Sequence, residues 1–465
     1  MKKKSLVVLS LLVAAAGAVA LLAQNQGDIR GTIKQGAAPR IAVPDFRGAG
    51  SAQAQMATYN ATLWDDLQNS GRLEMVGKGF YPLEIPQQPS DFKPPSPNGA
   101  RNGPWPTDWS APPAKANYLV FGYTAEQDGK LILHGWLYNV GQPDVTSSQV
   151  LGRLYVGTLD AEGAKKVAHD FAADILQQFG AMSLAGSKIY FTSDRTGKKE
   201  IWSMDYDGSN QKQLTTYKSI TNQVAVSADA KMFAFVTYPR EMRGSVEILS
   251  QPRIMVYSAE TNRRMNFYNP VASVNETPEF TPDGKRILFS STVNQVDPQI
   301  YVAGVDGSGL SRISHVNAIE VSPKVNPKTG SDVVFISGRS GSEQLWRMNI
   351  NGVDLERLTS GEGYVANPAW SPDGQRVAFC WTKGFEPGTY NIFIMDIASR
   401  ELVQLTHGVG RNENPAWAPD GVHIVFSSTR SRVAQIYTML ADGKNVQQLT
   451  TQGNNSQPVW AKAIN

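Results

Sequence analysis

The sequence predicts two parts, a small α/β domain followed by an all-β six-bladed propeller that its own C-terminal strand closes. Three observations support this prediction. A phrase containing Pro-Asp-Gly recurs after residue 180, aliphatic and aromatic residues alternate between the turns, and residues 40–180 carry no repeat. Repeats of about 40–50 residues with four short strands each are typical of propeller blades.

The composition is that of a globular protein, with 41% hydrophobic and 18% charged residues. Its 44 Lys+Arg against 41 Asp+Glu give a net charge of +3. This balance excludes a strongly basic nucleic-acid binder, so we expect no nucleic-acid partner. The one cysteine, Cys380, excludes an intramolecular disulfide and a Cys₄ or Cys₂His₂ zinc site.

The N-terminal segment has the pattern of a secretory signal. Lys2–Lys4 precede an apolar run, Leu6–Ala23, and small residues then offer cleavage after Ala20 or Ala23. We therefore expect residues 1–23 to be a signal peptide. The alternative is a retained anchor, because a spanning helix needs about 20 apolar residues. In both cases the remaining chain is expected outside the cytoplasm, with no membrane insertion once the signal is removed.

The α/β domain is expected over residues 40–180. Its strands are predicted at 41–46, 73–76, 117–121, 130–138 and 149–156, and its helices at 56–70 and 161–179. In the second helix Val167, Phe171 and Ile175 recur every four residues, and Gly180 ends the pattern. The resulting order predicts helices packed on a small mixed sheet.

Residues 82–113 interrupt this domain with ten prolines and no apolar periodicity. The segment is predicted to be an extended surface loop. The alternative is a polyproline II ligand for a partner protein.

The propeller is expected over residues 186–465. The phrase Asn367–Gly374 returns at Asn414–Gly421 and, with changes, at Thr277–Gly284. Proline presets φ and glycine accepts a positive φ, so each phrase ends in a tight turn. The strands that follow these turns or their equivalents are predicted to start near Ile189, Phe233, Ile287, Val333, Val377 and Ile424.

The last strand is expected to close the ring. The first blade has no Pro-x-Trp strand of its own, and Gln457–Trp460 supplies one. Closure removes the free sheet edges that would otherwise template aggregation. Within the second blade, Pro239–Pro252 is predicted to be an inserted, protruding loop.

Catalytic motifs are absent from the sequence. It contains no G-x-S-x-G, and its five histidines are scattered without paired spacing. We therefore predict no enzyme activity, no catalytic residue, no metal ligand and no cofactor. A metal ion held by several blades is left open, because such ligands show no local spacing.

A rigid ring that displays loops suits binding. Three hypotheses follow: a protein-binding scaffold, a propeller that binds a small ligand, glycan or ion, and an enzyme or the propeller gate of a peptidase.

Several residue groups resemble one known family. Ile41–Val43, Ser70–Leu73, Trp109 and Ala168–Asp170 look like the N-terminal domain of the TolB family, and the Pro-Asp-Gly blades look like its six-bladed propeller. The resemblance covers nearly the whole chain after the signal. It implies a non-catalytic periplasmic component of the Tol-Pal system that supports outer-membrane integrity, protein import and envelope constriction at cell division.

The resemblance also implies partners. A Pal-like peptidoglycan-associated lipoprotein would bind the propeller loops, and a TolA-like inner-membrane protein would bind the N-terminal region. The matching partner-binding positions precede Pro-x-aromatic strands: Asn275, Glu276, Thr277, Arg411, Asn412, Glu413 and Asn414. Two features depart from the family, since the loop at 82–113 is richer in proline and residues 24–39 show no clear TolA-binding segment.

Overall fold

The computed structural model describes residues 38–98, 102–261, 263–267, 269–270, 273–293, 296–383 and 389–463. The predicted signal peptide therefore lies outside the described residues. The described chain forms two compact units, one ending at Phe171 and the other continuing from Ala172, with Asn69–Gly71 belonging to the second. Within the described ranges no helix combines the length and the apolar content needed to cross a membrane.

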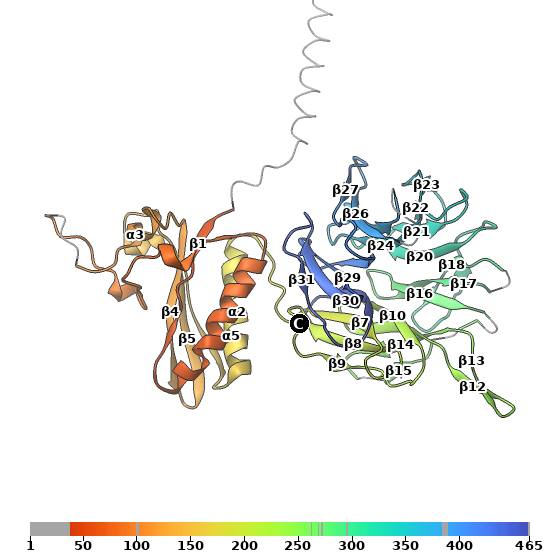
Figure 1. The fold of residues 1–465 in the computed structure, drawn as a ribbon, viewed down its shortest axis with the longest axis horizontal. Helices are drawn as coiled ribbons and strands as arrows, with labels where there is room; N and C mark the ends of the chain where they lie inside the picture. The colour runs from red at the N-terminus through yellow and green to blue at the C-terminus, as the bar shows by residue number, and fades with distance from the viewer. Residues whose placement is uncertain are drawn as a thin grey trace, which may run out of the picture. The chain divides into compact units, whose positions relative to one another are not determined.

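The first unit is built on a mixed sheet with the strand order β3-β1-β4-β5-β6, in which β2 also pairs with β4. The strands are β1 (Arg40–Ala42), β2 (Arg47–Gly48), β3 (Glu74–Met75), β4 (Tyr118–Gln127), β5 (Lys130–Asn139) and β6 (Gln149–Thr158). Strand β1 is parallel to β3 and β4, whereas β4, β5 and β6 are antiparallel. The predicted mixed sheet is confirmed (Figure 1).

Two long helices, α2 (Met56–Asn69) and α5 (Ala161–Gln178), cover one face of this sheet (Figure 1). Both were predicted from their apolar spacing. Phe171 of α5 is fully buried, and its ring lies above Gly135 of β5. A β-carbon at Gly135 would stand 2.7 Å from that ring, so only glycine allows the helix to pack this closely.

The proline-rich segment covers part of the opposite face of the sheet. Phe92 stacks on Tyr138 with ring centroids 5.6 Å apart and meets Phe121 edge-on at 5.4 Å. Trp109 is fully buried in the same cluster. The segment is therefore a cover for the core as well as a loop.

The first unit also contains short helices that the sequence did not predict. They are η1 (Gly50–Gln55), η2 (Lys78–Phe80), η3 (Pro89–Asp91), α3 (Pro106–Ser110) and α4 (Val145–Ser148). Two of them, η3 and α3, lie in the proline-rich segment. In α3 the proline occupies the first turn and the Asp108 carboxylate accepts the Trp105 N–H at 2.9 Å. Both features favour a helix start, although five residues give no apolar period to read.

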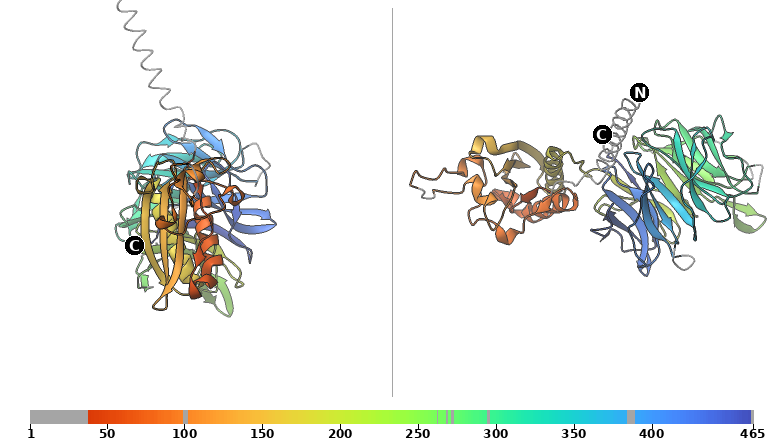
Figure 2. Two further views of the ribbon diagram at one scale, coloured as in Figure 1. Left: turned by 90° about the vertical axis from the view of Figure 1, so that its left-hand side faces the viewer. Right: turned by 90° about the horizontal axis from the view of Figure 1, so that it is seen from above.

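The second unit is a propeller of six four-stranded sheets (Figures 1 and 2). Blade 1 contains β32 (Asn455–Ala461), β7 (Lys188–Ser193), β8 (Glu200–Asp205) and β9 (Lys212–Gln213). Blade 2 contains β10 (Thr221–Val226), β11 (Met232–Thr237), β14 (Arg253–Ser258) and β15 (Arg263–Met265). Blade 3 contains β16 (Asn275–Phe280), β17 (Arg286–Ser291), β18 (Gln299–Gly304) and β19 (Ser311–Arg312).

The remaining blades repeat this order from the innermost strand outward. Blade 4 contains β20 (Glu320–Val325), β21 (Asp332–Ser337), β22 (Gln344–Asn349) and β23 (Glu356–Arg357). Blade 5 contains β24 (Val365–Trp370), β25 (Arg376–Trp381), β26 (Asn391–Asp396) and β27 (Leu402–Gln404). Blade 6 contains β28 (Asn412–Trp417), β29 (His423–Ser431), β30 (Val433–Leu440) and β31 (Gln447–Gln448).

The predicted propeller is confirmed in its strands and in its closure. Each of the six strands predicted after a turn begins one residue before the predicted start. The C-terminal strand β32 pairs with β7, and Trp460 stands opposite Ile189. Trp460 donates its Nε1–H to Ser187 Oγ at 2.9 Å and packs in the cluster that contains Phe191.

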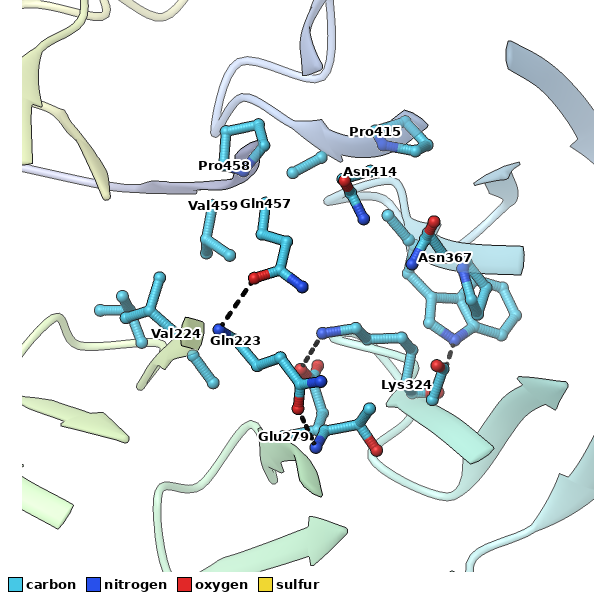
Figure 3. Close-up of a pocket in the computed structure, with 18 of the residues that line it drawn as sticks. Gln223, Val224, Glu279, Lys324, Asn367, Asn414, Pro415, Gln457, Pro458 and Val459 are labelled. Atoms are coloured by element: carbon cyan, nitrogen blue, oxygen red, sulfur yellow. Dashed lines mark hydrogen bonds and ion pairs between the residues drawn. The ribbon is translucent and has the colours of Figure 1, made fainter. Parts of the chain in front are cut away.

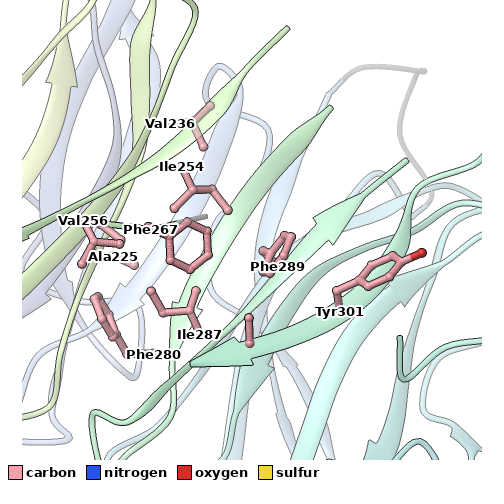
Figure 4. Close-up of a cluster of buried hydrophobic side chains, with 11 residues drawn as sticks. Ala225, Val236, Ile254, Val256, Phe267, Phe280, Ile287, Phe289 and Tyr301 are labelled. Carbon is pink, nitrogen blue, oxygen red and sulfur yellow. The ribbon is translucent and has the colours of Figure 1, made fainter. Parts of the chain in front are cut away.

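Neighbouring blades bury apolar side chains between their sheets. Between blades 2 and 3, Val236, Ile254 and Ile287 belong to one buried cluster, and Phe267 meets Phe289 edge-on at 5.9 Å (Figure 4). The alternation of side chains along each strand brings these residues to the same face. The inserted segment of blade 2 forms a hairpin, β12 (Arg240–Arg243) and β13 (Val246–Leu249), where the sequence predicted only a loop.

Candidate binding site in the propeller channel

The six innermost strands line a central channel with a cavity of about 370 Å³. Side chains from all six blades reach it, including Gln223, Glu279, Lys324, Asn367 and Gln457 (Figure 3). The channel therefore depends on ring closure, because β32 is one of its six walls.

Each innermost strand carries a bulge at the same position. Its register against the neighbouring strand shifts there, and the third residue of the strand has a φ between 51° and 55°. These six residues are Gln223, Thr277, Ser322, Asn367, Asn414 and Gln457. A bulge of this kind re-aims a side chain and is held only where the surrounding sheet stabilises it. All six side chains are uncharged and can form hydrogen bonds.

Hydrogen bonds join three of these bulge residues from one blade to the next. The backbone N–H of Gln223 donates to Oε1 of Gln457 at 3.1 Å, and the N–H of Thr277 donates to Oε1 of Gln223 at 2.7 Å (Figure 3). The amide groups of blades 1 and 2 thus fix the inner strands of blades 2 and 3. Their Nε2 groups remain as possible donors to a bound molecule.

The fifth residue of each inner strand contributes to a second ring along the channel. In blades 3 and 4 these residues are Glu279 and Lys324, which form an ion pair. Nζ of Lys324 lies 2.6 Å from Oε2 of Glu279, and Nε1 of Trp370 donates to the Lys324 carbonyl at 3.0 Å (Figure 3). Burial raises the pKa of Glu279, and the Lys324 ammonium opposes this shift. The pair makes the channel wall polar on one side, whereas Ala369 and Ala416 stand at the equivalent positions of blades 5 and 6.

The sequence-predicted binding residues lie at the start of β16 in blade 3 and of β28 in blade 6. Blades 3 and 6 are three blades apart in a six-bladed ring, so the two groups face each other across the channel. The structure places them at one end of the channel but does not bring them into contact. Thr277 and Asn414 line the channel itself.

Asn275 and Asn412 are fully buried, which the sequence did not indicate. Asn275 accepts a hydrogen bond from Ser291 Oγ at 2.8 Å. Asn412 accepts one from Ser428 Oγ at 2.8 Å and another from Arg430 Nη2 at 3.0 Å. Both side chains therefore hold the strand starts in place and are not presented to a partner.

Glu276, Arg411 and Glu413 are the accessible charged members of the predicted set. Glu276 accepts a hydrogen bond from the Tyr238 hydroxyl at 2.5 Å, and burial together with this carboxylate raises the pKa of Tyr238. Arg411 pairs with Glu413 at 2.7 Å, with 52% and 27% of the two side chains exposed.

Sequence reasoning missed the channel wall itself. Gln223 and Lys324 were not singled out, and Asn367 and Gln457 were noted only where repeated strands begin. A signal for most of this ring does exist, because five of the six bulge residues immediately precede proline. Within the described ranges no group of three His, Cys, Asp or Glu side chains could hold a metal ion.

The fold and the channel define the class of protein, a six-bladed β-propeller with an α/β unit ahead of it. Residues 245–380 and 356–463 match the family model described as the TolB beta propeller domain. Two proteins named "Protein TolB homolog" are each 31% identical to this chain. The one from Chlorobium chlorochromatii matches 56% of this chain and 45% of its own length, and the one from Chlorobium luteolum matches 50% of each.

The fold match covers more of the chain. The crystal structure of TolB from Acinetobacter baumannii superimposes with a TM-score of 0.69 and 22% identity over 91% of this chain and 96% of that one. The chain is similar to TolB in its fold, and residues 245–463 are similar in sequence to the TolB propeller. Its sequence matches span about half the length of the curated relatives.

Proposed function

We propose that this protein is a non-catalytic scaffold of the periplasmic Tol-Pal system. Its channel mouth, the end of the channel at which Glu276 and Glu413 lie, binds a Pal-like peptidoglycan-associated lipoprotein. The observation that carries the proposal is the mouth of a TolB-type propeller, where two charged groups on opposite blades flank a ring of uncharged hydrogen-bonding side chains. In this role the protein would support outer-membrane integrity and envelope constriction at division.

The geometry of the mouth supports a protein partner. Glu276 and Glu413 stand on opposite sides of the channel, so one domain seated over the mouth could contact both. Carboxylates at such a rim favour a partner with basic side chains and speed its association. The amide ring below them offers hydrogen bonds to the backbone of an inserted loop. Because bulges in a closed sheet hold this ring, little ordering entropy is lost on binding.

The proposed contact residues are Glu276, Thr277, Arg411, Glu413 and Asn414. Their positions at the starts of two inner strands support this proposal. Asn275 and Asn412 are proposed to act indirectly, because each is buried and bonded to its own blade.

A second candidate function is the binding of a small ligand, glycan or ion inside the channel. The cavity volume favours it, since pockets for small molecules typically measure about 300–1,000 Å³. A metabolite and metal screen by thermal shift would support this function if a compound raised the melting temperature. The two functions differ in whether the partner must be a protein.

The periplasmic location and the TolA-like partner rest on segments outside the described residues, the signal at 1–23 and the region before Ala38. Cell fractionation with N-terminal sequencing of the exported protein tests the location and the cleavage site. A binding assay with the C-terminal domain of the TolA-like protein tests the second partner.

The decisive experiment is calorimetric titration of the full mature chain with the soluble domain of the source organism's Pal-like lipoprotein. We expect the double variant Glu276→Arg/Glu413→Arg to weaken binding at least about tenfold, a change of about 1.4 kcal/mol. The effect should shrink at high salt, because rim charges are screened. The matched control is Glu401→Arg, an exposed charge reversal outside the channel.

Unchanged affinity in the double variant would show that the lipoprotein binds elsewhere on the protein. No binding by the wild-type chain, with folding verified by its melting curve, would reject the Pal assignment and favour the small-ligand function.

A further inference from the structure

Most strand edges in the described chain are short. The outermost strands of the six blades are two or three residues long, and β3 at one end of the first sheet has two residues. Short edges of this kind are poor templates for another strand. The hairpin of blade 2 has four-residue strands that carry the ion pair Arg240–Glu247.

Strand β6 is different, because it is a ten-residue strand at the other end of the first sheet. Among the described strands it pairs with β5 alone. It contains no proline and one charged residue, Arg153, and after a bulge between Gln149 and Leu151 its register against β5 is regular from Leu151 to Thr158. Natural proteins usually protect an edge of this length with charges, proline or a cover. The outer row of backbone N–H and C=O groups of β6 is therefore suited to pair with a further strand.

Three apolar side chains of β6 are exposed. Val150, Leu154 and Val156 have 40%, 50% and 43% of their surface exposed. Leu154 and Val156 alternate along the regular part of the strand, so both lie on the face away from the helices, whereas Val150 lies in the bulge. On the opposite face, Tyr155 contacts Phe171 of α5, with ring centroids 5.4 Å apart.

An aromatic strip continues from these residues across the sheet. Leu154 stands opposite His134, which stands opposite Tyr123. The rings of His134 and Tyr123 stack at 4.9 Å, and Trp136 follows 6.2 Å from His134. All three rings are half-buried. The neighbouring part of the same face is the part that Phe92 covers.

Gly152 gives the strip a specific shape at the edge. A β-carbon there would lie 2.8 Å from Cδ1 of Trp136, so the indole occupies the space above the glycine. A strand added to β6 would place a side chain beside this indole. Large aromatic side chains are the usual partners of a strand glycine.

The charge on this face favours an acidic partner. Lys130 is exposed at the end of β5 and stands opposite Thr158 of β6. On this face the three nearest rows pair Lys130 with uncharged residues or histidine: Gln127, Ala125, Ile132, Val156, Tyr123, His134 and Leu154. Glu126 stands in an intervening row, on the opposite face, where its carboxylate accepts a hydrogen bond from Ser51. Lys130 is therefore the charged side chain of these three rows, with Asp128 in the adjoining turn.

We propose that the outer edge of β6 is a docking site for an extended segment of another protein. The segment adds to the sheet as a further strand and satisfies the outer backbone groups of β6. Its alternate apolar side chains cover Leu154 and Val156, a large side chain contacts Trp136, and a carboxylate near one end pairs with Lys130. This site is separate from the channel and does not depend on the proposed lipoprotein binding.

The test uses the full mature chain and a phage-displayed library of random peptides of about ten residues, the length of a strand. Selection on the wild-type chain is followed by synthesis of the enriched peptides and measurement of their Kd. We expect enriched peptides to alternate apolar and polar residues and to carry an acidic residue near one end. Leu154→Lys/Val156→Lys should raise their Kd at least about tenfold, and the matched control Leu83→Lys, a fully exposed leucine of the same unit, should not.

A second variant tests the proposed charge pairing without any substitution in β6. Lys130→Glu should weaken the acidic peptides several-fold, and replacing their acidic residue by lysine should restore binding to that variant. Peptides that bind the wild type and the double variant equally would overturn the proposal, as would a library that yields no enriched binders. A wild-type chain that dimerises in sedimentation, and becomes monomeric with Leu154→Lys, would also overturn it, because a second copy would then be the occupant.

Discussion

Nζ of Lys324 in blade 4 lies 2.6 Å from Oε2 of Glu279 in blade 3, so the two blades are joined inside the channel by an ion pair. The position is poorly hydrated, which raises the pKa of Glu279, while the ammonium group counteracts that shift. The ammonium group of Lys324 thus opposes the protonation that burial of the Glu279 carboxylate favours.

The first prediction concerns the loss of this ammonium group. Lys324→Met should lower the free energy of unfolding by about 1–3 kcal/mol at pH 7, because a desolvated carboxylate loses its partner. The folded-state pKa of Glu279 should rise further above the unfolded value of about 4.3. Stability is then lost as the pH rises through the folded-state pKa. The deficit relative to wild type should therefore be small near pH 4 and larger at pH 7, as measured by urea unfolding.

The double variant Lys324→Met/Glu279→Gln is the control, because a neutral amide removes the unpaired charge. It should recover at least about half of the loss at pH 7. A deficit that does not change between pH 4 and pH 7 would show that lost packing, and not the unpaired carboxylate, destabilises the variant.

A second prediction compares two equivalent turn glycines. Gly374 and Gly421 have φ values of 70° and 66°. A β-carbon at Gly374 would stand 2.3 Å from Oδ1 of Asn326, whereas at Gly421 the nearest atom, on Pro372, is 3.9 Å away. Gly421→Ala should cost about 1–2 kcal/mol from the left-handed backbone alone. Gly374→Ala should cost about 2–5 kcal/mol, because overpacking is added to the same strain.

The side chain that causes this difference cannot easily move. Oδ1 of Asn326 accepts the backbone N–H of Lys328 at 2.9 Å, and its Nδ2 donates to the Gly374 carbonyl at 2.9 Å. Urea unfolding of both alanine variants measures the difference directly. Equal losses of unfolding free energy in the two variants would mean that the Asn326 side chain moves to accommodate the added β-carbon at the contact between blades 4 and 5.

The repeat made most of this fold predictable from the sequence. Pro-Asp-Gly turns have specific backbone requirements, and the strands after them alternate in a simple pattern, so their starts were predicted to within one residue. The closing strand was predictable because Gln457–Trp460 repeats the phrase of Asn414–Trp417. The short helix α3 was not, since five residues carry no period.

The channel was harder to predict because, apart from the prolines that follow five of the six bulge residues, its features leave no local pattern. Asn275 and Asn412 precede repeated strands like surface loop residues, and only the folded blade shows that serines and an arginine enclose them. The Glu279–Lys324 pair joins residues of two different repeats. Left-handed φ values at Gln223 and Thr277 arise from the bulged ladder and not from residues that prefer them.

A third prediction concerns Cys380, which is fully buried in β25. Its thiol donates to the Ala366 carbonyl at 3.2 Å, and burial raises its pKa. Because the thiolate is the reactive form, a disulfide reagent at pH 8 should label the native protein only as fast as the blade opens. Labelling should reach one thiol per chain in denaturant. Rapid labelling of the native protein would contradict the buried position.

The last prediction tests the contribution of ring closure to stability. Trp460 is 8% exposed, packs with Ile189 and bonds to Ser187, so it joins the final strand to the first blade. Trp460→Ala should cost about 3–5 kcal/mol, as for other buried large-to-small changes. The control Tyr364→Ala removes a ring that is 47% exposed and should change stability by less than about 1 kcal/mol. Deleting Gln457–Asn465 removes five of the seven residues of β32 and should abolish the single cooperative transition, because blade 1 then keeps three full strands and the channel loses a wall. A truncated chain that melts like the wild type would contradict closure as a source of stability.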